Sequence, residues 1–144
     1  MKALRRWGPA VAWAGLIYLF SSEVFSAQGT AKWIFPFLRW LFPTAGWPTI
    51  FFLHELLRKA GHFIEFFILS LFLLRGVRGE QRGWTLRWAL ASIALAAAYA
   101  ALDEFHQAFV PGRVASPGDV LIDTAGAAFA QLAAALRARI SRGE

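Results

Sequence analysis

The chain has 144 residues, of which 58% are hydrophobic and only 17% are charged. Soluble domains are nearer half apolar and a quarter charged, and the apolar excess here lies in long runs, which is typical of a membrane protein. The absence of cysteine excludes a disulfide framework and thiolate chemistry. A net charge of +6 does not indicate nucleic-acid binding, because the basic residues stand at the ends of apolar runs. We therefore expect one membrane domain over residues 1–144 and no nucleic-acid partner.

The first apolar run follows three basic residues and has Pro9 near its start. No small-residue cleavage site follows it, so we interpret it as a retained helix with Pro9 in its first turn. Three further runs are long enough to cross a membrane, the last two being rich in Ala and Gly, which lets helices pack closely in lipid. The sequence predicts an all-α integral membrane bundle of four transmembrane helices, at about residues 8–25, 56–75, 86–105 and 119–137.

The segment between the first two spans, residues 33–55, is apolar but contains prolines at positions 36, 43 and 48. Three prolines interrupt a helix too often for one regular span. Its tryptophans at positions 33, 40 and 47 are typical of the membrane–water interface. We expect a Trp/Pro-rich interfacial segment, with a re-entrant segment or a fifth span as alternatives.

Basic residues orient the four spans. Ten of the fifteen Lys and Arg residues precede the first span, surround the loop after the second, or follow the fourth: Lys2, Arg5, Arg6, Arg75, Arg78, Arg82, Arg87, Arg137, Arg139 and Arg142. Because Lys and Arg accumulate on the cytoplasmic side, we expect a multi-pass protein of the cell membrane with both termini in the cytoplasm. Most acidic residues then lie at or just below the outer surface: Glu23, Glu55, Glu65, Asp103, Glu104, Asp119 and Asp123.

Carboxylates inside a span are costly, so they usually face the bundle interior and have a partner or a function. Glu65 and Asp123 are the clearest cases, and Lys59, Arg58 or Arg113 could supply their counter-charge. The intervals of three from Lys59 through His62 to Glu65 predict one shared helix side. Asp103 and Gln107, four residues apart, would share a face if the third helix continues through them. The pattern predicts a polar site at the outer mouth of the bundle.

Two histidines, His62 and His106, leave two further readings open. With nearby carboxylates they could bind a cation, or one of them could act as a general acid or base. The stretches "HFIE" and "DEFHQ" do not match zinc-protease motifs. We therefore expect neither a metal nor another cofactor.

Three stretches, "YLFSSE", "KAGHFIEFFILSLFL" and "YAALDEFHQAFVPGRVASPGDVLIDTAGA", resemble the VanZ-like family. This family consists of small bacterial membrane proteins, and its founding member is associated with resistance to the glycopeptide teicoplanin. The resemblance implies that Asp123 occupies a position that is usually Asn in the family. It marks as ligand-binding candidates Lys59, His62, Glu65, Asp103, Glu104, Gln107, Arg113, Asp119 and Asp123.

The leading functional hypothesis is an outward-facing polar pocket that binds a cell-envelope or lipid-linked ligand. Membrane lipids, a lipid-linked cell-wall precursor or a glycopeptide are the expected partners, with Arg113 and Lys59 holding anionic groups. Such binding could contribute to teicoplanin resistance. One alternative is a membrane-embedded hydrolase or transferase, with His62, Glu65 and Asp103 as catalytic candidates. A structural or transport role, in which the charged residues form interhelical pairs or a proton path, is the other.

Overall fold

A computed structural model describes residues 2–141 and 143 of the chain. Five α-helices account for most of it, and the described residues contain no strand, so the predicted all-α class is confirmed. In chain order the elements are α1 (Lys2–Phe20), a short 3₁₀ turn η1 (Glu23–Phe25), α2 (Ala27–Leu41), α3 (Trp47–Arg78), α4 (Leu86–Gln107) and α5 (Pro117–Ile140).

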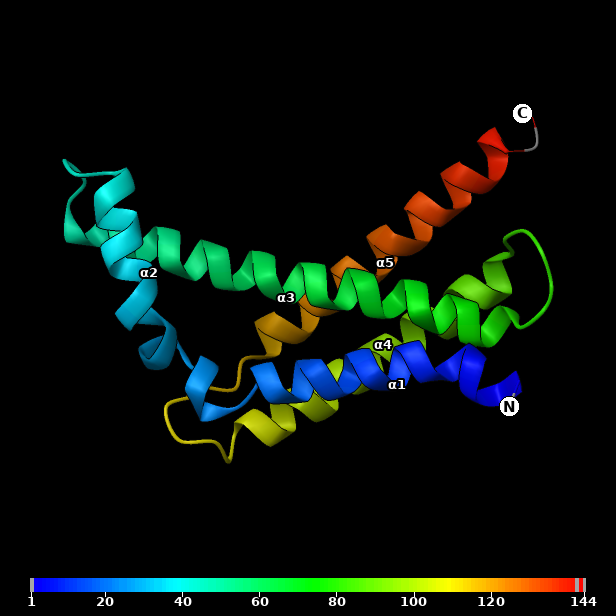
Figure 1. Cartoon of the computed structure of the whole chain (residues 1–144), viewed down its shortest axis with the longest axis horizontal. Helices are drawn as coiled ribbons and strands as arrows, with labels where there is room; N and C mark the ends of the chain where they lie inside the picture. Colours follow the sequence, from blue (N-terminus) through cyan, green and yellow to red (C-terminus); the bar gives the residue numbers. More distant parts are fainter. Residues whose placement is uncertain (1, 142, 144) are drawn as a thin grey trace.

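The four longest helices, α1, α3, α4 and α5, alternate in direction (Figure 1). The N-terminus, the α3–α4 loop and the end of α5 lie toward one end of the molecule, whereas α2 and the α4–α5 loop lie toward the other. Hydrogen bonds join the start of α1 to the end of α3: Arg6 Nη2 donates to the carbonyl of Gly76 at 2.7 Å, and Arg75 Nη2 donates to that of Arg5 at 3.1 Å. Nine of the ten basic residues predicted to share one side lie among the residues that the structure describes, and they belong to chain segments that the fold brings to the same end.

The long helix α3 is the centre of the bundle, and its closest partner is α5. Gly126 of α5 lies against the backbone of Phe63, where a Cβ would clash with the carbonyl oxygen of Phe63. One turn further along, Gln131 Nε2 donates to Ser70 Oγ at 2.8 Å, and Ser70 Oγ donates to the carbonyl of Ala127 at 3.0 Å. As predicted from their small residues, α4 and α5 pack together. In addition, α3 packs closely against Gly126 of α5.

Three of the described helices, α3, α4 and α5, are long and apolar enough to cross a membrane. Many large hydrophobic side chains on the outside of the molecule are exposed, such as Leu90, Leu121 and Phe129, as a lipid-facing surface requires. The remaining predicted span, 8–25, corresponds to α1, which is not among these three. A membrane protein is supported, and the fourth transmembrane helix stays a prediction.

The helix at the predicted first span, 8–25, has different limits from that span. The helix begins by Lys2, so Pro9 stands inside it rather than in its first turn. Proline has no N–H to offer the carbonyl four residues earlier, that of Arg5, and this carbonyl accepts a hydrogen bond from Arg75 instead. The helix ends at Phe20, and after the η1 turn Ser26 caps α2 by accepting a hydrogen bond from Gly29 N at 3.1 Å.

The predicted 33–55 connector also needs correction, because its second half belongs to α3. Pro48 lies in the first turn of α3, where the missing N–H costs nothing, so the helix that contains the predicted second span begins at Trp47, before residue 56. Pro36 is accommodated inside α2, which ends before Pro43. At 15 residues, α2 is about 22 Å long, short of the roughly 30 Å hydrocarbon core. Its Trp33 and Trp40 are exposed, and its position in the membrane interface stays a prediction.

Candidate functional site

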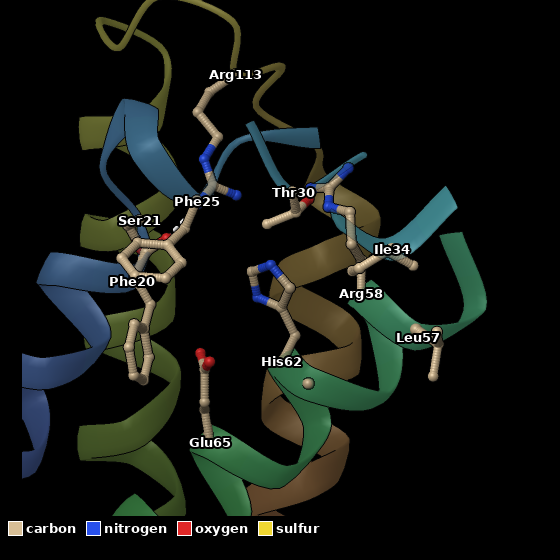
Figure 2. Close-up of a pocket in the computed structure, with 11 residues that line it drawn as sticks. Phe20, Ser21, Phe25, Thr30, Ile34, Leu57, Arg58, His62, Glu65 and Arg113 are labelled. Carbon is tan, nitrogen blue, oxygen red and sulfur yellow. Dashed lines mark hydrogen bonds between the residues drawn. The ribbon is translucent and has the colours of Figure 1, made fainter. Parts of the chain in front are cut away.

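A pocket of about 300 Å³ opens where the end of α1, the η1 turn, α2, α3 and the α4–α5 loop meet (Figure 2). Its walls are mainly apolar, with Phe20, Phe25, Ile34 and Leu57 among them. Its polar groups come from Ser21, Thr30, Arg58, His62, Glu65 and Arg113. The pocket thus combines two guanidinium groups with one imidazole and one carboxyl group in an apolar cup.

The imidazole of His62 is held from behind by α5. Its Nδ1 lies 3.3 Å from Oδ1 of Asp123, whose side chain is 1% exposed. Neither oxygen of Asp123 has a hydrogen-bond partner with good geometry among the described residues. The imidazole of His62 is the nearby group that can compensate the charge of this buried carboxylate. A carboxylate facing Nδ1 favours a proton on that nitrogen and leaves Nε2 as the acceptor. Figure 2 shows the ring projecting into the pocket above Glu65.

Of the three charged residues predicted to share one side of this helix, Lys59 is exposed and does not line the pocket. Each residue turns an α-helix by about 100°, so two steps of three residues place Lys59 about 120° away from Glu65. Arg58, by contrast, lies within about 40° of both His62 and Glu65. The second cation of the pocket is therefore Arg58, whose Nη1 donates to Glu55 at 3.3 Å, and not Lys59.

Behind the pocket, Ser21 connects the end of α1 to α4. Its hydroxyl donates to Asp103 Oδ2 at 2.7 Å, and the same oxygen accepts a hydrogen bond from Gln107 Nε2, also at 2.7 Å. All three side chains are buried. Asp103 and Gln107 are thus brought together as predicted, but only their partner Ser21 reaches the pocket wall.

The α4–α5 loop carries Arg113 across the pocket mouth. The preceding Gly112 adopts a positive φ of 73°, which an L side chain rarely tolerates. Arg113 Nη2 donates to the carbonyl of Phe20, at the end of α1, and to that of Ser22, which also accepts a hydrogen bond from the N–H of Phe25. The loop itself is held by Glu104, whose Oε2 accepts a hydrogen bond from the N–H of Ser116 at 2.7 Å.

Burial, and then repulsion from the nearby Arg58 guanidinium, lower the pKa of Arg113 from its ordinary value. The nearby carboxylates Asp103, Glu65 and Glu104 act in the opposite direction. The positive charge at this position is consequently less stable than in water. An anion in the pocket would offset that cost.

The sequence profile of the VanZ/LLP1 family matches residues 7–138 of the chain. The chain belongs to the VanZ/LLP1 family. The resemblance carried by the three quoted stretches is thereby confirmed, and with the apolar helices it supports a VanZ-like membrane protein. The chain has no significant match among curated proteins or among solved structures.

The positions marked by the VanZ-like resemblance separate into two groups. His62, Glu65 and Arg113 line the pocket, and Asp123 supports His62. Asp103, Glu104 and Gln107 are buried supports of α1 and the loop, while Asp119 is partly buried in the first turn of α5. His106 stacks on Tyr18, with ring centroids 4.5 Å apart. Within residues 2–141, no three His, Asp or Glu side chains converge as a metal site, so the cation-binding alternative gains no support.

Sequence reasoning missed most of the pocket walls. Thr30 and Ile34 lie on α2, and Phe20 and Phe25 flank the turn after α1, none of which carries a polar pattern. His54 was also overlooked: it is buried, its Nε2 lies 3.2 Å from Thr30 Oγ1, and its ring packs edge-on against Phe35. In the sequence, the available signal was a histidine in an apolar stretch, one helical turn before Arg58. The structure shows that this histidine is buried where α2 folds back on α3.

Proposed function

We propose that this VanZ-like protein binds the anionic headgroup of a lipid-linked cell-envelope molecule in the pocket between α1, α2 and α3. The observation that carries the proposal is the convergence of Arg58 and Arg113 on one pocket whose walls are mainly apolar. Guanidinium groups bind phosphate and carboxylate through paired hydrogen bonds. A phosphate group is the headgroup chemistry that two such cations fit best.

Arg113 is prepared for such a ligand. Its Nη2 is fixed by the backbone carbonyls at the end of α1, whereas its buried Nε has no hydrogen-bond partner among the described residues. A buried donor without a partner costs free energy. A phosphate oxygen would satisfy this donor and compensate the guanidinium charge at the same time.

The apolar walls and the size of the pocket define the rest of the ligand. Phe20, Phe25, Ile34 and Leu57 would contact the first part of a lipid chain beyond the phosphate. About 300 Å³ is at the lower end of the range for drug-sized ligands. The pocket therefore fits a headgroup, and we do not place a whole glycopeptide in it.

In a bacterial cell membrane, the positive-inside bias would place the basic end of the bundle in the cytoplasm and the pocket at the outer surface. This arrangement requires α1 to act as the fourth span, with α2 in the outer interface. A contribution to teicoplanin resistance would then follow from occupancy or alteration of envelope lipids near the drug's target. The second candidate function, a membrane-embedded hydrolase or transferase, is favoured by the pairing of His62 with Asp123.

The proposal is tested by thermal unfolding of the detergent-purified protein with decylphosphonate, which has a phosphate-like headgroup on a lipid chain. A ligand present at about 100 times its Kd adds about 2.7 kcal/mol to the free energy of unfolding, so we expect the unfolding temperature to rise by roughly 5 °C or more. Decanol and dodecyl phosphocholine, which lack a dianionic headgroup, should give much smaller shifts.

Variants assign the effect to the pocket. Arg113→Ala should lose most of the decylphosphonate shift, whereas Arg139→Ala, at an exposed position in the last turn of α5, should keep it. Equal shifts with decanol and decylphosphonate, or a shift that Arg113→Ala leaves intact, would refute anion binding in this pocket. A shift with Mg²⁺ or Zn²⁺ alone would instead favour the cation-binding alternative.

A further inference from the structure

We propose that the pocket is a phosphatase centre: it hydrolyses a phosphate monoester of a lipid alcohol, with Nε2 of His62 as the nucleophile that accepts the phosphoryl group. This inference rests on the proposed binding function and adds a reaction to it. The inference depends on one arrangement of side chains. Asp123 lies in the protein interior, His62 lies between it and the pocket, and the two arginines line the pocket.

His62 has the surroundings that a nucleophilic imidazole needs. Asp123, which is almost fully buried, faces Nδ1 at 3.3 Å, and its negative charge favours a proton on that nitrogen over one on Nε2. The other ring nitrogen is then free to attack. When Nε2 forms a bond to phosphorus, the ring becomes positively charged, and the adjacent carboxylate of Asp123 stabilises that charge.

The substrate phosphate would lie between the imidazole and the guanidinium groups. Figure 2 shows His62 between Glu65 on one side and Arg58 and Arg113 on the other, all projecting toward the same space. Phosphoryl transfer depends mainly on positioning and on stabilisation of the equatorial oxygens, which arginines provide. The apolar walls formed by Phe20 and Leu57 would hold the lipid part of the leaving alcohol.

In the first step, Nε2 of His62 attacks phosphorus in line with the ester oxygen, so the leaving oxygen lies on the side of phosphorus away from His62. Glu65, the one acid among the eleven described residues that line the pocket, lies on the opposite side of His62 and is not placed to protonate that oxygen. The bond between phosphorus and the ester oxygen breaks, and the leaving oxygen takes the proton carried by the phosphate monoanion. The products are the lipid alcohol and a phosphohistidine.

In the second step, a water molecule attacks phosphorus from the side opposite Nε2 and transfers a proton to a phosphate oxygen. The bond between phosphorus and Nε2 breaks, its electron pair returns to Nε2, and inorganic phosphate leaves. His62 regains its starting form. The sum is the conversion of a phosphate monoester and water into an alcohol and inorganic phosphate, with no further reactant.

The test measures phosphate release from decyl phosphate by the purified full-length protein. The wild type should release phosphate, whereas His62→Gln should lose at least 100-fold in rate while keeping the thermal shift with decylphosphonate. His106→Gln, which changes the histidine stacked on Tyr18 outside the pocket, should retain the wild-type rate. Asp123→Asn keeps an acceptor for Nδ1 but loses the charge, so it should lower kcat about tenfold with unchanged phosphonate binding.

The phosphoenzyme gives an independent readout. With ³²P-labelled 4-nitrophenyl phosphate, whose leaving group needs no proton, the wild type quenched in base during turnover should carry the labelled intermediate. The trapped label should be stable in base, labile in acid, and absent from His62→Gln. Decylphosphonate binding without phosphate release would overturn the phosphatase and leave the proposed binding function standing. The same rate in His62→Gln and the wild type would also overturn it, and absence of phosphonate binding would remove both proposals.

Discussion

Replacing Gly126 with alanine is expected to destabilise the bundle by roughly 2–3 kcal/mol, although alanine is the better helix former. A Cβ at this position would clash with the carbonyl oxygen of Phe63 and would lie 3.1 Å from its carbonyl carbon. The obstacle is backbone, so α3 and α5 would have to separate. Overpacking of this kind costs about 1–3 kcal/mol or more, which exceeds the roughly 1 kcal/mol that alanine gains in helix propensity.

Gly15→Ala is the matched control, because nothing lies within 4 Å of a Cβ built on Gly15 in the middle of α1. Thermal unfolding in detergent should show a lower unfolding temperature for Gly126→Ala and an equal or higher one for Gly15→Ala. If both substitutions raised the unfolding temperature, the close contact between α3 and α5 would not exist in the folded protein.

Replacing Asp103 with alanine is expected to cost about 2–4 kcal/mol, because it removes the one acceptor that Ser21 and Gln107 share. The two remaining groups are 3.4 Å apart, too far for a good replacement bond, and both are buried. Buried donors that lose their acceptor pay their full desolvation cost. The substitution also removes the hydrogen bond that links the end of α1 to α4. The hydrogen bond that Tyr99 of α4 donates to the carbonyl of Ala14 in α1, at 2.6 Å, would remain.

Asp103→Asn separates the acceptor from the charge. The Asn carbonyl oxygen can accept from both Ser21 and Gln107, and the substitution removes a charge from an apolar region, so we expect a loss below about 1 kcal/mol. Thermal unfolding of the two variants side by side gives the comparison. If Asp103→Asn were as unstable as Asp103→Ala, the negative charge itself would be what the bundle requires.

The helical class and the membrane character could be predicted because they depend on composition and long apolar runs. The helix limits could not. The predicted first span placed Pro9 at its start because a proline inside a helix leaves one carbonyl unpaired. Only the fold shows that Arg75, seventy residues away, satisfies that carbonyl. Pro48 was interpreted as a break, yet it stands where a new helix begins.

The candidate site could be predicted in part for a similar reason. Local spacing located His62, Glu65 and Asp123, since carboxylates inside spans are rare and functional. Spacing in threes wrongly included Lys59, because the drift of a helix over six residues is too large to keep both ends on one face. The walls supplied by α2 and the η1 turn depend on how the chain folds back on α3, which no short-range pattern records.

The central claim is that a phosphate-bearing lipid occupies the pocket between α1, α2 and α3. The most direct measurement uses a decylphosphonate with a photoreactive diazirine near the headgroup, bound to the protein in lipid nanodiscs, followed by mass-spectrometric mapping of the crosslinked residues. We expect labelling of the apolar walls, Phe20, Phe25, Ile34 and Leu57, that excess decylphosphonate competes away and that Arg113→Ala reduces. Labelling spread over exposed positions such as Leu90, Leu121 and Phe129, and unaffected by competitor or variant, would contradict the account.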